Sequence, residues 1–186
     1  MNMRKSLLSI AVILIFSGAA FAQQFICTDG KTHFFSKAPL EDIEATSAKT
    51  VCAINTSNRK VFSKIAVQSF VFRDKLMQEH FNENYLESDK FPYSVFDAEI
   101  KEGIDFAKDG TYDVTLVGTL DMHGVKQNRE IKGKLTIVNG APVRATAEYF
   151  VKLKDHKIKI PNAVLMNIAE EIKVDVDFTF IKYEKK

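Results

Sequence analysis

The stretch 111–138 constrains the fold most, because two segments of alternating apolar and polar residues meet there at one tight turn. Apolar side chains occupy even positions in 112–122 and odd positions in 131–137, the period of strands with one buried face. Both sets share a face only if an even number of residues joins the strands. His123-Gly124 fits that loop, since glycine supplies the positive φ of a two-residue turn. The sequence therefore predicts an antiparallel hairpin with one dry face.

Further strands are predicted along most of the chain, in 33–37, 41–54, 61–72, 93–100, 143–151 and 172–180. The connection 139–141 is interpreted as a three-residue hairpin loop, because the apolar positions on both sides of it are odd-numbered. Apolar residues recur at helical spacing in 76–85, which predicts a short helix before Phe91-Pro92. A second short helix is predicted from Pro161 through Ile168.

About eight strands in meander order form a sheet with one apolar face. Such a sheet must close on itself or find a second sheet, because open edges stay unpaired and an apolar face avoids water. The predicted fold class is all-β, an eight-stranded antiparallel barrel with one or two short helices. A barrel of this size either fills its lumen with side chains or holds one small ligand.

Residues 1–22 have the features of a secretory signal peptide. Arg4 and Lys5 precede an apolar run, and Ala20-Phe21-Ala22 matches the small-x-small pattern of signal cleavage. The apolar run has about ten residues, whereas a membrane span needs about twenty. We therefore expect cleavage near Ala22/Gln23 and a mature domain, 23–186, that is periplasmic or secreted and has no transmembrane span.

The two cysteines of the chain, Cys27 and Cys52, are candidates for a disulfide, because exported proteins with paired cysteines usually form one. They lie symmetrically about Pro39-Leu40, so a hairpin that turns there sets one opposite the other. Two separate buried thiols are the alternative. Closure of this loop would stabilise the fold by about 3 to 4 kcal/mol in the chain-entropy model.

The charge distribution argues against nucleic acid or an anionic membrane surface as the main partner. The chain has a formal charge of +2, and the predicted signal removes Arg4 and Lys5 but no acidic residue, so the mature chain is neutral. Acidic residues are interleaved with the lysines, and no concentrated basic patch results.

Catalytic and metal sites receive little support from the sequence. No histidine or cysteine pair has metal-ligand spacing, and no Gly-x-Ser-x-Gly motif or phosphate loop is present. His123 beside Asp121 offers an acid–base pair, but a histidine that begins a His-Gly turn is more often a turn residue. We therefore predict a binding protein rather than an enzyme, with no catalytic and no metal-ligating residues. The four histidines lie far apart: His33, His80, His123 and His156.

Three groups of motifs resemble the YceI-like family in the same order along the chain. They are His80-Phe81 with 85–88 and 90–93, then Leu120-Asp121-Met122-His123-Gly124-Val125-Lys126, then 150–155 with 158–161 and 168–171. The chain departs from the family at Gln127, in the N-terminal pattern 29–33, and in its two cysteines. The resemblance covers nearly the whole mature chain. It implies an extended lipocalin-like barrel in an exported bacterial protein, with a lumen that takes a long isoprenoid or similar lipid.

Candidate ligand contacts are the inward apolar residues of the strands and the large side chains of the predicted helix. Inward apolar residues are usually ordinary core, so the helical segment 77–91 is the better candidate, because methionine and aromatic rings adapt to a flexible chain. We expect this segment to act as a gate. The predicted ligand-binding residues are Phe70, Phe72, Met77, Phe81, Tyr85, Phe91, Phe96, Leu116, Leu120, Met122, Leu135 and Phe178.

The predicted function is a carrier or store of an apolar small molecule or lipid, with no cofactor other than a bound polyisoprenoid or fatty-acid-like lipid. The alternative is a periplasmic protein-binding or envelope-stress module whose barrel is filled by side chains. An exposed apolar patch would favour that alternative, and Val117, Phe150 and Ile181 are the outward apolar residues that would form it. The sequence leaves open whether the protein is a monomer or a homodimer.

Overall fold

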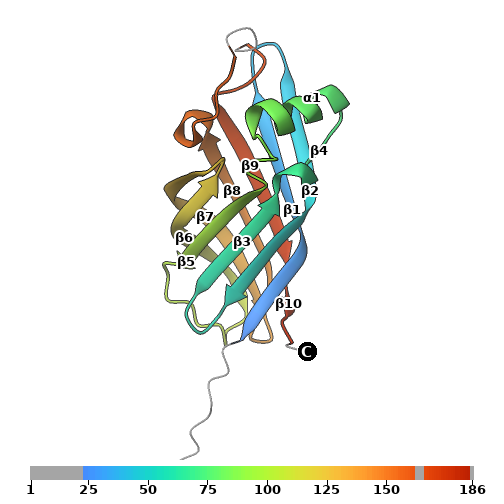
Figure 1. Ribbon diagram of the computed structural model, residues 1–186. Helices are drawn as coiled ribbons and strands as arrows, with labels where there is room; N and C mark the ends of the chain where they lie inside the picture. Colours follow the sequence, from blue (N-terminus) through green and yellow to red (C-terminus); the bar gives the residue numbers. More distant parts are fainter. Residues whose placement is uncertain (1–22, 162–165, 185–186) are drawn as a thin grey trace, which may run out of the picture.

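The structure is a computed structural model that describes residues 23–161 and 166–184, and these residues form an antiparallel β-barrel (Figure 1). Eight longer strands make the wall: β1 (Gln24–Lys37), β2 (Asp42–Asn55), β3 (Lys60–Ala66), β5 (Tyr93–Ile100), β6 (Gly110–Met122), β7 (Val125–Val138), β8 (Ala141–Lys152) and β9 (Glu171–Thr179). Shorter elements are β4 (Val71–Phe72), β10 (Ile181–Lys182), the 3₁₀ turns η1 (Val67–Ser69) and η3 (Leu153–His156), the helix α1 (Lys75–His80) and its π-helical continuation η2 (Phe81–Tyr85).

The wall closes because β1 pairs with β2 on one side and with β9 on the other. Around the barrel the order is β1-β2-β3-β5-β6-β7-β8-β9, and every pairing is antiparallel. β4 extends the β2 ladder and β10 extends the β1 ladder. The predicted all-β class and eight-stranded barrel are confirmed.

The β6–β7 hairpin has the predicted register. Met122 pairs with Val125, so His123-Gly124 is a two-residue turn, and both residues have positive φ, 53° and 69°. Two positive φ values define the turn type whose twist matches that of the flanking strands. The predicted strand 93–100 and the helix within 76–85 are also confirmed.

The β7–β8 hairpin differs from the predicted three-residue loop. Val138 pairs with Ala141, so Asn139-Gly140 is a two-residue turn with φ of 52° and 72°. A register shift beyond Thr136 then restores the pairing of odd with odd positions, as in Leu135 with Ala145. The extra residue that the apolar pattern required is therefore accommodated by a bulge within the strands rather than by the loop.

The predicted strand 61–72 is interrupted. β3 ends at Ala66. The η1 turn then leads to β4, which pairs with β2 at the end of the barrel where α1 lies (Figure 1). Ser69 holds the break, because its hydroxyl donates to the Ala66 carbonyl at 2.6 Å. The predicted signal 1–22 and residues 162–165 of the predicted helix 161–168 lie outside the described residues. The described part of that helix, 161 and 166–168, is not helical and forms a turn and a bend at 166–168.

One end of the barrel is packed and the other is covered by α1. Phe25, Ile54, Ile137 and Phe180 belong to a buried cluster at the end where β1 begins and β10 lies, whereas α1 crosses the opposite end (Figure 1). The barrel thus has one mouth, at the end that α1 crosses, and a site is expected there.

No helix in 23–161 or 166–184 is both long and apolar enough to cross a membrane.

Cys27 and Cys52 are direct partners across β1 and β2, as the symmetry about Pro39-Leu40 predicted, and both are buried thiols in this structure. Burial raises the pKa of Cys27, and it raises the pKa of Cys52 to about 12. Facing Cβ atoms in such pairs lie about 4.5–5.5 Å apart, whereas a disulfide needs about 3.8 Å. A small local movement therefore suffices to form the bond.

We predict that Cys27 and Cys52 are bridged in protein from an oxidising compartment. Thiol titration of denatured, unreduced protein should then detect no free thiol. Reduction should lower the melting temperature without abolishing the fold, because the constraint is worth about 3 kcal/mol and the core supplies most of the stability. Two titratable thiols in such protein would contradict the prediction.

We predict that Gly124→Ala destabilises the fold more than the matched variant Gly140→Ala. Both glycines are the second residue of a two-residue turn with positive φ, so each variant strains the backbone by about 1–2 kcal/mol. A Cβ on Gly124 would also lie 2.5 Å from Phe91, whereas a Cβ on Gly140 would meet only a carbonyl at 3.7 Å. The expected difference is about 1–3 kcal/mol in the free energy of unfolding. Equal losses in chemical denaturation would show that Phe91 moves away freely.

Candidate functional site

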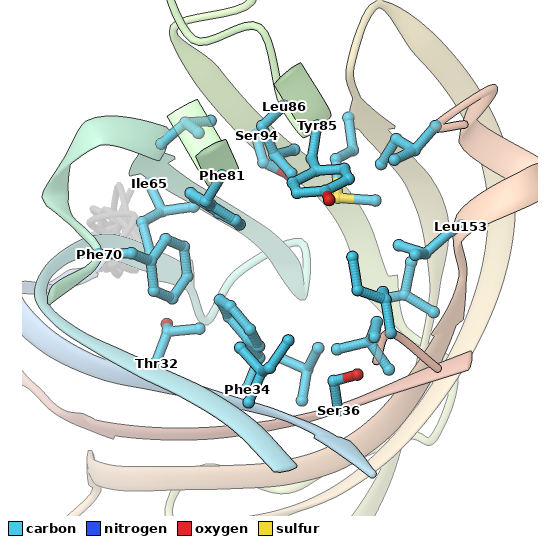
Figure 2. A pocket seen from close by; sticks show the side chains of 18 of the residues that line it. Thr32, Phe34, Ser36, Ile65, Phe70, Phe81, Tyr85, Leu86, Ser94 and Leu153 are labelled. Atoms are coloured by element: carbon cyan, nitrogen blue, oxygen red, sulfur yellow. The ribbon is translucent and has the colours of Figure 1, made fainter. Parts of the chain in front are cut away.

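A cavity of about 140 Å³, here called the upper cavity, lies inside the barrel beneath α1 and η2 (Figure 2). Every strand of the barrel wall except β7 contributes to its lining, together with β4, η1, η3, α1 and η2, and none of the lining residues is charged. Nearly all of the lining surface is carbon. An apolar cavity with few polar groups suits an apolar ligand, because burial is then the main driving force.

The small polar side chains of the upper cavity are already satisfied by the protein. Thr32 shares a hydrogen bond of 2.7 Å with Thr50, Ser36 accepts from the backbone N–H of Ala169, and Ser94 donates to the backbone carbonyl of Asp121. These groups gain little by contacting a polar ligand. The phenol groups of Tyr85 and Tyr149 also line the cavity, and burial raises the pKa of both, so both are neutral at physiological pH.

A cluster of four phenylalanines forms one wall of the upper cavity. Phe34 of β1 lies with its ring centroid 5.3 Å from Phe70 and 5.6 Å from Phe72. Phe81 stacks on Phe34 at 5.5 Å and lies 4.9 Å from Phe72. Figure 2 shows Phe34, Phe70 and Phe81 pointing into the same space. Phe81 therefore connects the segment that covers the mouth to the barrel wall.

The covering segment, α1 with η2 (75–85), is here called the lid. Asp74 caps the N-terminus of its helix, because its carboxylate accepts from the backbone N–H of Met77 at 2.8 Å. At Phe81 the helix widens, and the N–H of Leu86 bonds the carbonyl of Phe81, a π-type spacing. No lid residue is fully buried. A short helix with so little burial belongs to the low-stability parts of a fold.

The chain that follows the lid is anchored by His123 of the β6–β7 turn. The His123 Nδ1–H donates to the carbonyl of His156 at 3.0 Å, and Nε2 lies 3.0 Å from a carboxylate oxygen of Glu87. The Phe91 ring packs edge-on against the imidazole at 4.6 Å. Lys90 and His123 together hold the pKa of Glu87 below its usual range. Both His123 nitrogens thus have structural partners, and neither of those partners is Asp121.

His156 has a similar structural role. It is fully buried, and its Nδ1–H donates to the carbonyls of Met122 and Val125 on either side of the turn. Burial lowers its pKa and favours the neutral ring. On the outer face, His33 lies between Glu44 and Asp175. In 23–161 and 166–184 no three histidine, cysteine, aspartate or glutamate side chains converge as metal ligands.

The predicted ligand-binding residues divide among three places. Those that line the upper cavity are Phe70, Phe72, Met77, Phe81, Tyr85, Leu120 and Met122. Those that line a second, lower cavity are Phe96, Leu116, Leu135 and Phe178. Phe91 lines neither cavity and instead packs on His123 and Gly124. In the upper cavity Met77, Phe81 and Tyr85 of the lid thus meet residues of other elements. These are Phe70 after η1, Phe72 of β4, and Leu120 and Met122 of β6.

Several lining residues of the upper cavity were not singled out from the sequence, among them Phe34, Ile43, Ile65, Tyr149, Leu153 and Val174. Tyr149 lies in the predicted strand 143–151, at an odd position like the apolar residues of that strand. Its inward direction was therefore predictable from the sequence. Phe34 is harder to find, because Thr32 and Ser36 share its face and make that face look polar.

Val117, Phe150 and Ile181 are exposed, as their outward positions predicted. They lie on β6, β8 and β10, which are not neighbours in the barrel. Residues on separated strands do not form one continuous apolar patch, so they give little support to a protein-docking face built from these three side chains.

Comparison with known proteins supports the resemblance found in the motifs. The YceI-like domain family matches residues 28–180, whereas curated protein sequences give no match. A polyisoprenoid binding domain from Saccharophagus degradans is 14% identical with a TM-score of 0.66, over 86% of this chain and 98% of that one. Burkholderia cenocepacia BcnA is 15% identical with a TM-score of 0.62, over 80% and 94%. The Campylobacter jejuni YCEI protein is 14% identical with a TM-score of 0.55, over 99% and 92%. At these identities the likeness establishes the fold.

We predict that Glu87→Gln lowers the melting temperature at pH 7 more than Glu83→Gln, an exposed lid position that removes the same charge. A carboxylate with a lowered pKa stabilises the fold above the ordinary glutamate pKa and loses that contribution as pH falls through its own value. The difference between wild type and Glu87→Gln should therefore be constant near neutrality, begin to shrink below the ordinary glutamate pKa of about 4.3, and vanish only below the lowered pKa of Glu87. Thermal melts from pH 3 to 7 check this. Identical melts of the two variants at pH 7 would remove Glu87 as an anchor.

Proposed function

Since the chain belongs to the YceI-like family, we propose that it binds one long apolar molecule, a polyisoprenoid or similar lipid, in the upper cavity of its barrel. The observation that carries the proposal is the cavity of about 140 Å³, whose lining has no charged residue and whose small hydroxyl groups are already bonded within the protein. Such a space selects hydrocarbon, since each Å² of apolar surface buried contributes about 25 cal/mol.

The ligand class is supported by a solved structure of the same fold. The Saccharophagus degradans domain, which this chain resembles over most of its length, is a polyisoprenoid binding domain. The wall of four phenylalanines and the methionines Met77 and Met122 fit a flexible, branched hydrocarbon, because both side-chain types offer large apolar area in adaptable shapes. The same features accommodate a fatty-acid-like chain.

The lid is the proposed gate. It covers the mouth and has no fully buried residue. It is attached to the barrel by the Gln78 side chain, which accepts from the Phe72 N–H, and by packing of Met77, Phe81 and Tyr85, and the Glu87–His123 contact holds the chain after it. Opening of a segment with so few contacts costs less free energy than opening the barrel wall. A ligand therefore enters and leaves at the lid while the strands keep their pairing.

The proposed setting is an exported carrier or store. The motive is the signal-like segment 1–22 with its basic start, apolar run and small-x-small site. A binding protein that is free of the membrane shields an apolar chain from water during transfer. The role differs from catalysis, because the described lining of the cavity contains no histidine, cysteine, lysine or carboxylate side chain.

We predict that Phe81→Glu abolishes ligand binding, whereas Leu76→Glu, on the same helix but 59% exposed, leaves it unchanged. A carboxylate at Phe81 would be desolvated in the bound state, which should weaken binding ~100-fold or more. The loss of melting temperature should be modest, because the lid is only partly buried. The measurement is native mass spectrometry with lipid extraction on wild type and both variants purified from the native host, beside thermal melts.

The expected pattern is a co-purifying amphiphile of defined mass in wild type and Leu76→Glu but not in a folded Phe81→Glu. Wild-type protein that carries no amphiphile and takes up no added isoprenoid alcohol would refute the proposed function. Unchanged binding by a folded Phe81→Glu would refute only the gate.

A further inference from the structure

A second space, the lower cavity, lies deeper in the barrel and has a volume of about 80 Å³. It arises because small residues face inward there: Ala145 and Ala147 on β8, and Gly133 on β7, which pairs with Ala147. The rest of the lining is mostly apolar, including Leu135 and Phe178, and its polar members are Ser63, Thr146 and Lys134, whose exposed ammonium group pairs with Asp113. The lower cavity is therefore also suited to hydrocarbon.

Tyr149 separates the two cavities. Among the described residues that line either space, Tyr149 alone lines both. On β8 it is the next inward residue above Ala147, and Val151 follows it toward the mouth. On β6 the division falls between Leu120, which lines the upper cavity, and Leu116, which lines the lower one.

The ring of Tyr149 is held by its neighbours. It packs against the buried cluster of Leu120, Val151 and Val174, together with Phe96 and Val176. Burial raises the pKa of its phenol to about 12, while the Arg129 charge acts in the opposite direction. The partition is therefore an uncharged aromatic ring packed among apolar side chains, with the Arg129 guanidinium near its phenol.

We propose that Tyr149 sets the length of the chain that this barrel accepts, by closing the upper cavity from below. This inference rests on the proposed function. A chain longer than the upper cavity must leave its end in water at the lid or displace the ring, and both reduce its affinity. Removal of the ring joins the two cavities, and each CH₂ group that then becomes buried raises affinity about fourfold.

The test uses delipidated protein and a series of isoprenoid alcohols from farnesol and geranylgeraniol upward, which grow by whole isoprene units. Affinity of wild type should rise with length and then stop rising at the alcohol that fills the upper cavity. Tyr149→Ala should move this plateau to an alcohol at least one unit longer, and its affinity for that alcohol should exceed that of wild type about tenfold or more.

Three further variants make the outcome specific to the ring. Tyr149→Phe keeps the ring and should retain the wild-type plateau. Tyr149→Ala with Ala145→Leu refills the lower cavity and should return the plateau toward wild type. Tyr149→Leu, which retains more volume, replaces Tyr149→Ala if the latter does not fold, as judged by its melting transition, and should give a smaller shift in the same direction.

The possible results separate the inference from its premise. If wild type and all variants bind no alcohol, the proposed function fails and the inference fails with it. If wild type binds but a folded Tyr149→Ala or Tyr149→Leu keeps the same plateau, the inference alone is overturned. A shift in Tyr149→Phe as large as that in Tyr149→Ala also overturns it, because the hydroxyl and not the ring would then set the length.

Discussion

Pairing of β1 on both of its edges is the interaction on which the rest of the structure depends. Phe34 lies in both ladders, opposite Ala45 of β2 and Val174 of β9, so it is fixed in the wall where the barrel closes. Its ring then provides the surface on which Phe70, Phe72 and Phe81 assemble. The aromatic wall therefore depends on closure of the sheet, which fixes Phe34 in place.

The interior is uneven because side-chain volume changes along the barrel axis. At the end opposite the mouth, Phe25, Ile54, Ile137 and Phe180 fill the space. Above them, glycine and alanine on β7 and β8 leave the lower cavity, and Tyr149 closes it. Protein interiors are usually close-packed, so two apolar spaces in one barrel mark a lumen that the sequence leaves unfilled. That property is consistent with the proposed binding role.

Two histidines, His123 and His156, support the mouth through hydrogen bonds. His156 ties η3 to the β6–β7 turn, and His123 ties the same turn to Glu87 behind the lid. These hydrogen bonds stabilise positions that lack other backbone pairing. The His-Gly turn is thus a joint between the wall, the crossing after β8 and the lid. Phe91 was predicted to contact the ligand, but its ring packs against His123 of this turn instead.

Much of the fold was determined by the sequence itself, because alternation with a period of two is a local property. It placed β5, both strands of the β6–β7 hairpin and their turn, and helical spacing located the lid. Positions decided by contacts far apart in the chain were not accessible in this way: the bulge near Thr136, the break at Ser69, and the partition at Tyr149. Alternation shows which side chains point inward, but the space they leave depends on which side chains meet across the barrel. Only closure of the sheet brings those partners together, so the tertiary structure decided where the lumen is filled and where it is open.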